Sequence, residues 1–160
     1  QNPKFEIETY LDESISQWDL HHLPNSPQMV IGAVIEDPLR DIVTQPASLV
    51  RLTHNLAAVH RDVDASPYEK PLVYGGHTVA LAQASLSRIF PGVASIVGWH
   101  TCDHVGPVFE EDLLSFEHRP LEEIPTKNGR LVAVQVKAFA HRKNTEPTEV
   151  LDWVPVLFLR

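Results

Sequence analysis

The spacing of hydrophobic positions predicts two helices in the middle of the chain. Apolar side chains recur at helical spacing from residue 46 to 58, behind a proline that suits the first turn of a helix. Residues 78–90 are small or apolar on nearly every side, which is typical of a buried helix, and Pro91-Gly92 would end it. We therefore expect a first helix at 46–58 and a buried central helix at 78–90.

After residue 92 the pattern changes to that of strands and turns. Alternating or continuous apolar runs, separated by turn residues at 127–129, predict strands at 93–101, 108–116, 131–138 and 150–159. Consecutive strands joined by short turns are typical of an antiparallel meander. We expect one long antiparallel sheet in this half of the chain.

Two shorter strands are predicted before the first helix, at residues 5–9 and 29–35, with a loop at 20–28 between them. A polar loop at 60–70 precedes the buried helix. An antiparallel sheet wrapped around a single helix satisfies this order of elements and belongs to the α+β class. The sequence thus predicts one domain over residues 1–160, with an extra helix and loop before the central helix.

Composition and charge narrow the classes of partner. The 160 residues are 43% hydrophobic and 21% charged, as in an ordinary globular domain, and the net charge is −8 with scattered basic side chains. Nucleic acid is therefore not expected as a partner. The single cysteine, Cys102, and the lack of an apolar run of membrane-spanning length favour a cytoplasmic protein without a membrane partner. Because the chain starts at Gln1 rather than Met, we expect a processed or fragmentary chain.

The strongest acid–base candidates are Asn55 and His60. The imidazole exchanges protons near neutral pH, and an amide beside it can hold a water molecule. A continuous helix would place the two side chains about 140° apart, so their pairing requires a bend near Ala58. Spacing alone favours the alternative, in which Asn55 is a helix cap and His60 a surface residue.

A second candidate feature is the Tyr74-Gly75-Gly76-His77 run before the buried helix. Paired glycines at a helix start leave backbone N–H groups accessible and let a ligand approach closely, which suits an oxygen that gains negative charge. The alternative is a tight turn, with His77 as a capping or packing residue.

Three metal-ligand types, His100, Cys102 and His104, would share one face of a strand. Adjacent ligands without a distant fourth are poor zinc spacing, so a polar cluster is favoured and no metal is expected. On this reading Trp99 and Asp103 face the other way. The sequence contains no Gly-x-Ser-x-Gly elbow, P-loop, dinucleotide fingerprint or His-Glu-x-x-His, which disfavours those enzyme classes.

Residues 55–77 resemble the MaoC-like hotdog family of (R)-specific enoyl-CoA hydratases and dehydratases. In that family, Asp-x-Asn-Pro-Leu-His is followed by a small residue, an aromatic, a Pro, two aliphatics and His-Gly at the start of the central helix. Here His60 is followed by Ser66, and residues 68–75 match the later part with Tyr74 in the His place. The resemblance implies the hotdog fold.

Further segments extend the resemblance. Residues 104–112 look like the family's strand ending in Pro-Val and Gly-Asp, with Glu111 in the Gly place. Residues 72–77 and 150–153 look most like the double-hotdog branch that includes mesaconyl-CoA hydratase-like proteins. Because one polypeptide of that branch contains two hotdog units, the resemblance implies that this chain is one half of such a protein or a unit that dimerises.

The resemblance also implies roles for individual residues. The family's proton-transfer His falls on His60, and its Asp falls on Asn55, which can orient water but cannot accept a proton. Asp62 or Asp64 are weaker replacements for the carboxylate. The helix-start glycine that holds the thioester carbonyl falls on Gly75. Gly76 beside it is assigned to the same thioester-binding site, and Asp62, Tyr74 and His77 are auxiliary candidates.

The implied activity is that of a hydro-lyase of acyl-CoA and fatty-acid metabolism, which hydrates an enoyl thioester or dehydrates a 3-hydroxyacyl thioester. It needs no cofactor beyond the coenzyme A of its substrate, and its partner is a second hotdog unit. Two alternatives stay open. One is a non-catalytic hotdog unit that binds acyl thioesters or supports a partner; the other is a hotdog thioesterase with a carboxylate such as Glu69.

Overall fold

The computed structural model describes residues 6–10 and 12–160. Four short helical segments precede one long helix along the chain: η1 (Ile7–Tyr10), α1 (Glu13–Ser16), α2 (Pro46–Leu52), η2 (Ala58–His60) and then α3 (Gly75–Ile89). The strands are β1 (Ile35–Glu36), β2 (Asp41–Ile42), β3 (Val93–Asp103), β4 (Leu113–Pro125), β5 (Arg130–His141) and β6 (Thr148–Leu159).

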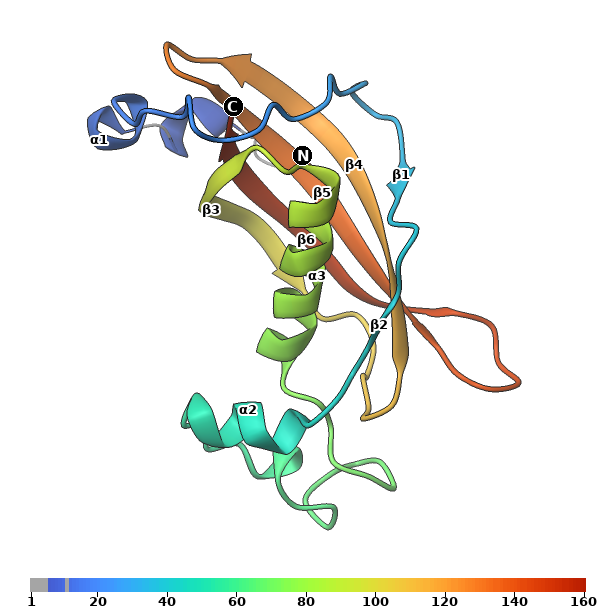
Figure 1. Cartoon of the computed structure of the whole chain (residues 1–160). Coiled ribbons are helices and arrows are strands. Elements are labelled where there is room, and N and C mark those ends of the chain that lie inside the picture. The colour runs from blue at the N-terminus through green and yellow to red at the C-terminus, as the bar shows by residue number, and fades with distance from the viewer. Residues whose placement is uncertain (1–5, 11) are drawn as a thin grey trace.

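The strands form one antiparallel sheet that curves around α3 (Figure 1). Their order is β1-β4-β5-β6-β3, and β2 also pairs with β4. Ala82 and Leu86 of α3 are fully buried in a core that includes Val134 of β5 and Trp153 of β6. The α+β prediction of a sheet around one central helix is confirmed, although the strand expected at 108–116 begins only at Leu113.

Helix α3 is buried on one side only. Its buried residues are Thr78, Val79, Ala82, Ser85 and Leu86, whereas Ala80, Gln83, Ala84 and Ser87 are exposed. The prediction that this helix is buried nearly all round is wrong for this chain, because the sheet of one unit covers only the face that packs on it. Small side chains made the pattern look apolar on the open side as well.

The other face of the sheet is covered by the N-terminal segment. Ile7 and Leu20 pack with Leu131 of β5 and Phe158 of β6 in a second core. The strand predicted at 5–9 is wrong where it can be judged: Phe5 lies outside the described residues, and Ile7–Tyr10 form a 3-10 helix. The N–H and hydroxyl of Thr9 both donate to the Glu6 carbonyl, so local hydrogen bonds replace strand pairing.

Two further boundaries differ from the sequence predictions. The run at 29–35 is broken by a turn at Gly32, whose φ is +83°, and only Ile35–Glu36 pairs with β4. The helix expected to reach residue 58 ends at Leu52, because His54 adopts a left-handed conformation with φ +53°. Both differences arise where single residues take backbone conformations that hydrophobic spacing does not reveal.

A buried polar cluster joins α3 to β4 and to the segment after β1. The Ser85 hydroxyl donates to Asp37 Oδ2 at 2.6 Å and lies 2.8 Å from Nε2 of His118, whose side chain is fully buried. Arg88 forms ion pairs with Asp37 and Asp41, both at 2.7 Å. Burial lowers the pKa of His118 to about 4. This cluster fastens the edge segment of residues 37–41 to the helix.

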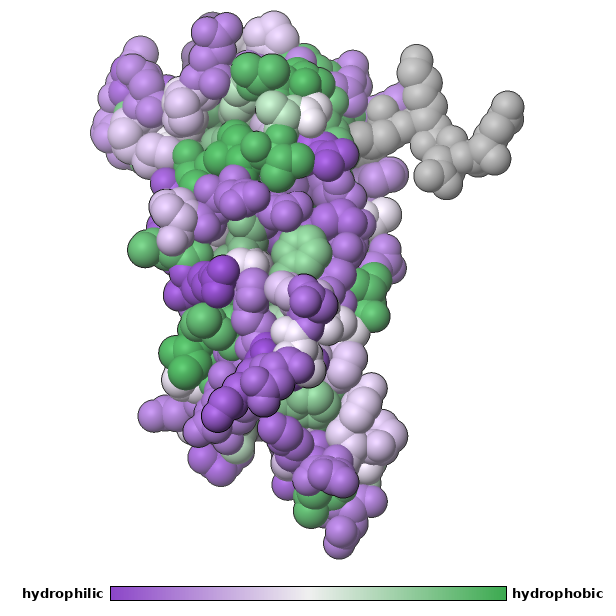
Figure 2. All heavy atoms as spheres, turned by 90° about the vertical axis from the view of Figure 1, so that its right-hand side faces the viewer, coloured by the Kyte–Doolittle hydropathy of each residue, from purple (hydrophilic) through white to green (hydrophobic). Residues whose placement is uncertain are grey.

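The edge of the sheet formed by β1 and β2 is partly hydrophobic on its outer side. Figure 2, which faces this side of the molecule, shows hydrophobic groups interspersed with polar surface. The exposed hydrophobic residues of this segment are Val30, Ile31, Val34, Leu39 and Ile42.

Candidate functional site

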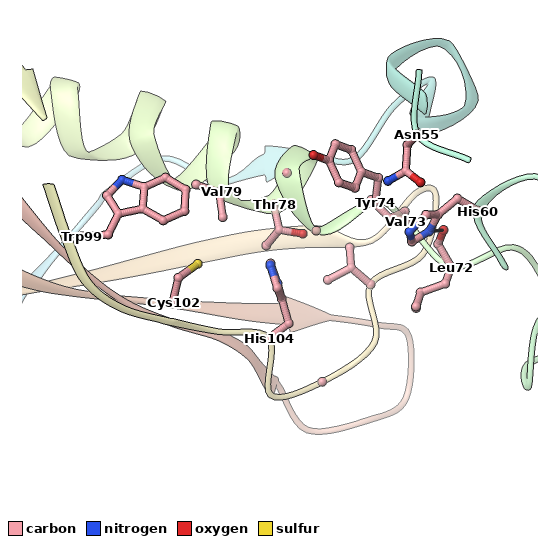
Figure 3. Close-up of a pocket in the computed structure, with 14 residues that line it drawn as sticks. Asn55, His60, Leu72, Val73, Tyr74, Thr78, Val79, Trp99, Cys102 and His104 are labelled. Atoms are coloured by element: carbon pink, nitrogen blue, oxygen red, sulfur yellow. Dashed lines mark hydrogen bonds between the residues drawn. The ribbon is translucent and has the colours of Figure 1, made fainter. Parts of the chain in front are cut away.

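A cavity of about 440 Å³ lies between the first turns of α3, the end of β3 and the segment that precedes the helix. Figure 3 shows Asn55, His60 and Tyr74 at one end and Trp99 at the other, with Cys102 and His104 between them below the helix. Gly75 and Gly76 also line this cavity. The structure thus brings together both predicted acid–base residues, the two glycines and Tyr74.

The His60 ring and the backbone of the preceding residue, Val59, are both hydrogen-bonded to Leu72. His60 Nδ1 lies 2.8 Å from the Leu72 carbonyl oxygen, while the Leu72 N–H donates to the Val59 carbonyl at 3.0 Å. A carbonyl can only accept, so Nδ1 carries the proton and Nε2 of the neutral ring is left as a proton acceptor. The Tyr74 ring packs edge-on against the imidazole, with 5.8 Å between centroids.

Asn55 lies beyond the end of α2, which supplies the bend that its pairing with His60 requires. Its N–H donates to the Val50 carbonyl, and its Oδ1 accepts from the Ala57 N–H at 2.9 Å. The Arg61 guanidinium donates to the Asn55 carbonyl. With Oδ1 engaged in this turn, the Nδ2 donor is the side-chain group left to face the cavity.

The two glycines are required by side chains packed against the start of α3. A Cβ on Gly75 would lie 2.5 Å from His104 Nε2, and a Cβ on Gly76 would lie 2.6 Å from Tyr74 Cε1. Tyr74 is the N-cap residue and makes no side-chain capping bond. Because the first N–H groups of a helix have no partner within it, the amides at this end are available to an oxygen bound in the cavity.

The remaining predicted candidates lie outside the cavity lining. Asp62 and Asp64 are exposed, and Asp62 Oδ1 accepts from the Asp64 N–H in a local turn. His77 lies in the first turn of α3, where its N–H donates to the Tyr74 carbonyl and burial lowers the pKa of its imidazole. The structure therefore brings neither acidic residue nor His77 to the lining of the cavity.

Sequence reasoning placed β3 side chains only partly correctly. Trp99, Cys102 and His104 line the cavity, whereas His100 does not. Strict alternation put Trp99 on the opposite face to Cys102, and this is wrong because the pairing of β3 with β6 shifts register between residues 99 and 101. A bulge of this kind moves following side chains to the other face. Thr78 and Val108 also line the cavity, and no sequence pattern indicated that they would.

In residues 6–10 and 12–160, no group of three or more His, Cys, Asp or Glu side chains is arranged to hold a metal ion. Burial raises the pKa of the Cys102 thiol and lowers the pKa of the His104 imidazole. None of the helices in these described residues combines the length and the hydrophobicity that a membrane span requires.

Comparison with curated proteins finds mesaconyl-CoA hydratase of Cereibacter sphaeroides, 25% identical over 131 residues, which are 82% of this chain and 36% of that protein. No family model matches the sequence. The chain therefore spans about a third of the length of this curated relative.

Among solved structures, a conserved hypothetical protein of Mycobacterium tuberculosis with a double hotdog fold has a TM-score of 0.79 and 29% identity. The match covers 100% of this chain and 48% of that one. A candidate MaoC domain dehydratase from Chloroflexus aurantiacus has a TM-score of 0.73 and 17% identity, over 99% of this chain and 48% of its own. The chain therefore has the hotdog fold, and it is similar in sequence to a mesaconyl-CoA hydratase and in structure to MaoC-like proteins.

Proposed function

We propose that this hotdog unit catalyses the reversible addition of water to the α,β-double bond of an enoyl-CoA thioester. The observation that supports this function is that His60 and the free amides at the start of α3 line the same cavity. A proton acceptor and a site for a developing oxyanion are the two groups that the reaction requires. The match to a mesaconyl-CoA hydratase agrees with this class of reaction.

The proposed reaction needs only water, the substrate and groups of the protein. His60 Nε2 takes a proton from a water molecule held by Asn55, and the water oxygen bonds to the β-carbon of the substrate. The electrons of the double bond move toward the thioester oxygen, which accepts hydrogen bonds from the amides of Gly75 or Gly76. The imidazolium then returns the proton to the α-carbon. One such amide donor contributes about 3 kcal/mol of transition-state stabilisation.

The test is to incubate the protein with crotonyl-CoA and mesaconyl-CoA while following both the enoyl absorbance and free thiol. Loss of absorbance without thiol release is the expected result. Thiol release would instead show a thioesterase. Binding of the thioester with neither signal would show a non-catalytic unit.

A second function, thioester binding without catalysis, is favoured by one observation. Asn55 cannot accept a proton, and its Oδ1 already accepts from the Ala57 N–H. If the cavity only binds the thioester, Asn55→Asp would not create hydration activity. If Asn55 positions water for His60, the same variant should retain or raise activity.

We also propose that a second hotdog unit completes the native protein, either in the same polypeptide or as a second copy. The open face of α3 and the match to about half of a double-hotdog chain support this proposal. The mass of the denatured native chain distinguishes the two arrangements. A mass near twice 18.0 kDa indicates a double unit, and a mass near 18.0 kDa with a dimer in solution indicates two copies.

Gly75→Ala should greatly lower the rate of hydration while leaving the fold intact. The new methyl group would lie 2.5 Å from His104 Nε2, between the imidazole and the start of the helix, so it would displace the ring and block approach to the amides. We expect kcat/KM to fall by about 10² or more, the cost of a lost oxyanion donor. Stability should change by less than about 1 kcal/mol, because alanine favours the helix over glycine.

The matched control is Ala33→Ser, an exposed small residue ahead of β1 that does not line the cavity. Its hydration rate should equal that of the wild type. Thermal unfolding followed by circular dichroism checks that both variants fold. Full activity of a folded Gly75→Ala protein would contradict the placement of the thioester oxygen at this end of α3.

A further inference from the structure

The cavity contains a second imidazole that the reaction described above does not use. His104 directly follows β3, and a Cβ on Gly75 would lie 2.5 Å from its Nε2 and 2.7 Å from its Cε1. Since a Cα–Cβ bond is ~1.5 Å long, Nε2 lies within about 4 Å of Gly75 Cα. The Nε2 edge of the ring therefore faces the helix backbone.

The direction of this contact places the ring beside the free amides. Cα–Cβ bonds of a helix tilt toward its N-terminus, so the space that a Gly75 side chain would occupy, and that His104 borders, lies at the amide end of α3. Figure 3 shows the His104 ring directed toward the first turn of the helix, between the His60 end of the cavity and Trp99. An oxygen bound to the Gly75 amide would lie next to this imidazole.

His104 is also free to bind a ligand. Within the described part of the chain its ring nitrogens have no hydrogen-bond partner. Partial desolvation lowers the pKa of the ring against the opposite effect of Asp103, although residue 104 as a whole stays exposed, so the imidazole is neutral near pH 7. A neutral imidazole beside a positive helix end suits hydrogen-bond donation to a developing oxyanion better than it suits proton transfer.

We propose that His104 is a further catalytic residue, whose Nε2–H donates a hydrogen bond to the thioester oxygen held at the start of α3. No proton moves in this step: the hydrogen bond strengthens as the oxygen gains charge and weakens as the α-carbon is protonated. The inference rests on the proposed function. It also accounts for Gly75, because any larger residue would separate the donor from the amides.

The test compares His104→Phe, which keeps a ring of similar size without a donor, with His104→Gln, which keeps an N–H donor. We expect His104→Phe to lower kcat for crotonyl-CoA by about 10²-fold, with less than a threefold change in KM. His104→Gln should retain at least a tenth of the wild-type kcat. The matched control, His22→Gln on an exposed loop, should behave as the wild type. An unchanged kcat in a folded His104→Phe protein would overturn the inference.

A second measurement separates this inference from the proposed function. Butyryl-CoA has the thioester carbonyl but no double bond, so it binds without reacting. If His104 donates to that oxygen, the imidazole N–H resonance of His104 should shift on addition of butyryl-CoA and be absent from the spectrum of His104→Phe. Absence of hydration in the wild type would reject the proposed function, and an unmoved His104 resonance would reject the hydrogen bond.

Discussion

His60→Ala is expected to lower kcat/KM for crotonyl-CoA hydration by about 10³-fold, within the range that general acid–base groups contribute. The hydrogen bond from Nδ1 to the Leu72 carbonyl fixes the ring so that Nε2 is the proton acceptor. No other side chain that lines the cavity combines this fixed tautomer with a position beside Asn55. Loss of the imidazole therefore removes the proposed base and the route by which the proton returns to the α-carbon.

The measurement is the initial rate of enoyl absorbance loss, with butyryl-CoA affinity measured in parallel. Affinity should change by less than about threefold, because the amides that hold the thioester are untouched. His22→Ala, an exposed histidine outside the cavity, is the control. A His60→Ala protein that hydrates crotonyl-CoA at the wild-type rate would exclude His60 from proton transfer.

Acidification from pH 6.5 to 4 is expected to remove about 3 kcal/mol of stability through His118 alone. The pKa of this imidazole falls from 6.5 to about 4 on folding because the ring is buried. Between these two values the unfolded chain binds a proton that the folded chain does not, so stability falls as pH falls. Well above pH 6.5 the ring is neutral in both states and the contribution is constant.

Urea unfolding at a series of pH values measures this slope. His118→Leu places an apolar side chain in the buried position and removes the titrating group, so its stability should vary less between pH 6.5 and 4 than that of the wild type. His22→Leu, which removes an exposed histidine, should leave the slope intact. Equal slopes for the wild type and His118→Leu would contradict the assignment.

The fold was predictable where hydrophobic spacing alone distinguishes a helix or a strand. The alternation of residues 131–138 and the apolar run at 150–159 lie within β5 and β6. The central helix was also recognisable, but its open face was not, because alanine and serine suit a buried and an exposed surface equally. The break in the strand predicted at 29–35 and the end of the helix predicted at 46–58 depend on left-handed backbone conformations at Gly32 and His54. Hydrophobic spacing does not encode these conformations.

The site was predictable where spacing and chemistry coincide in one segment. His60, Gly75 and Gly76 could be proposed because a histidine and a helix-start glycine pair lie close in sequence, and the structure places them around one cavity. The cavity-facing position of Trp99 could not, since a shift in strand register sets it. The role proposed for His104 could not be predicted either, because its contact with Gly75 joins residues far apart in the sequence.

The attachment of His60 to residue 72 has a consequence for behaviour on warming. Two hydrogen bonds tie Val59 and His60 to Leu72, and the intervening segment of residues 61–71 is mostly exposed. Such a segment opens at a lower free-energy cost than the strands of the sheet. Local opening of residues 61–71 would move the imidazole away from the cavity while the sheet stays folded. Heat inactivation would therefore precede melting and reverse on cooling.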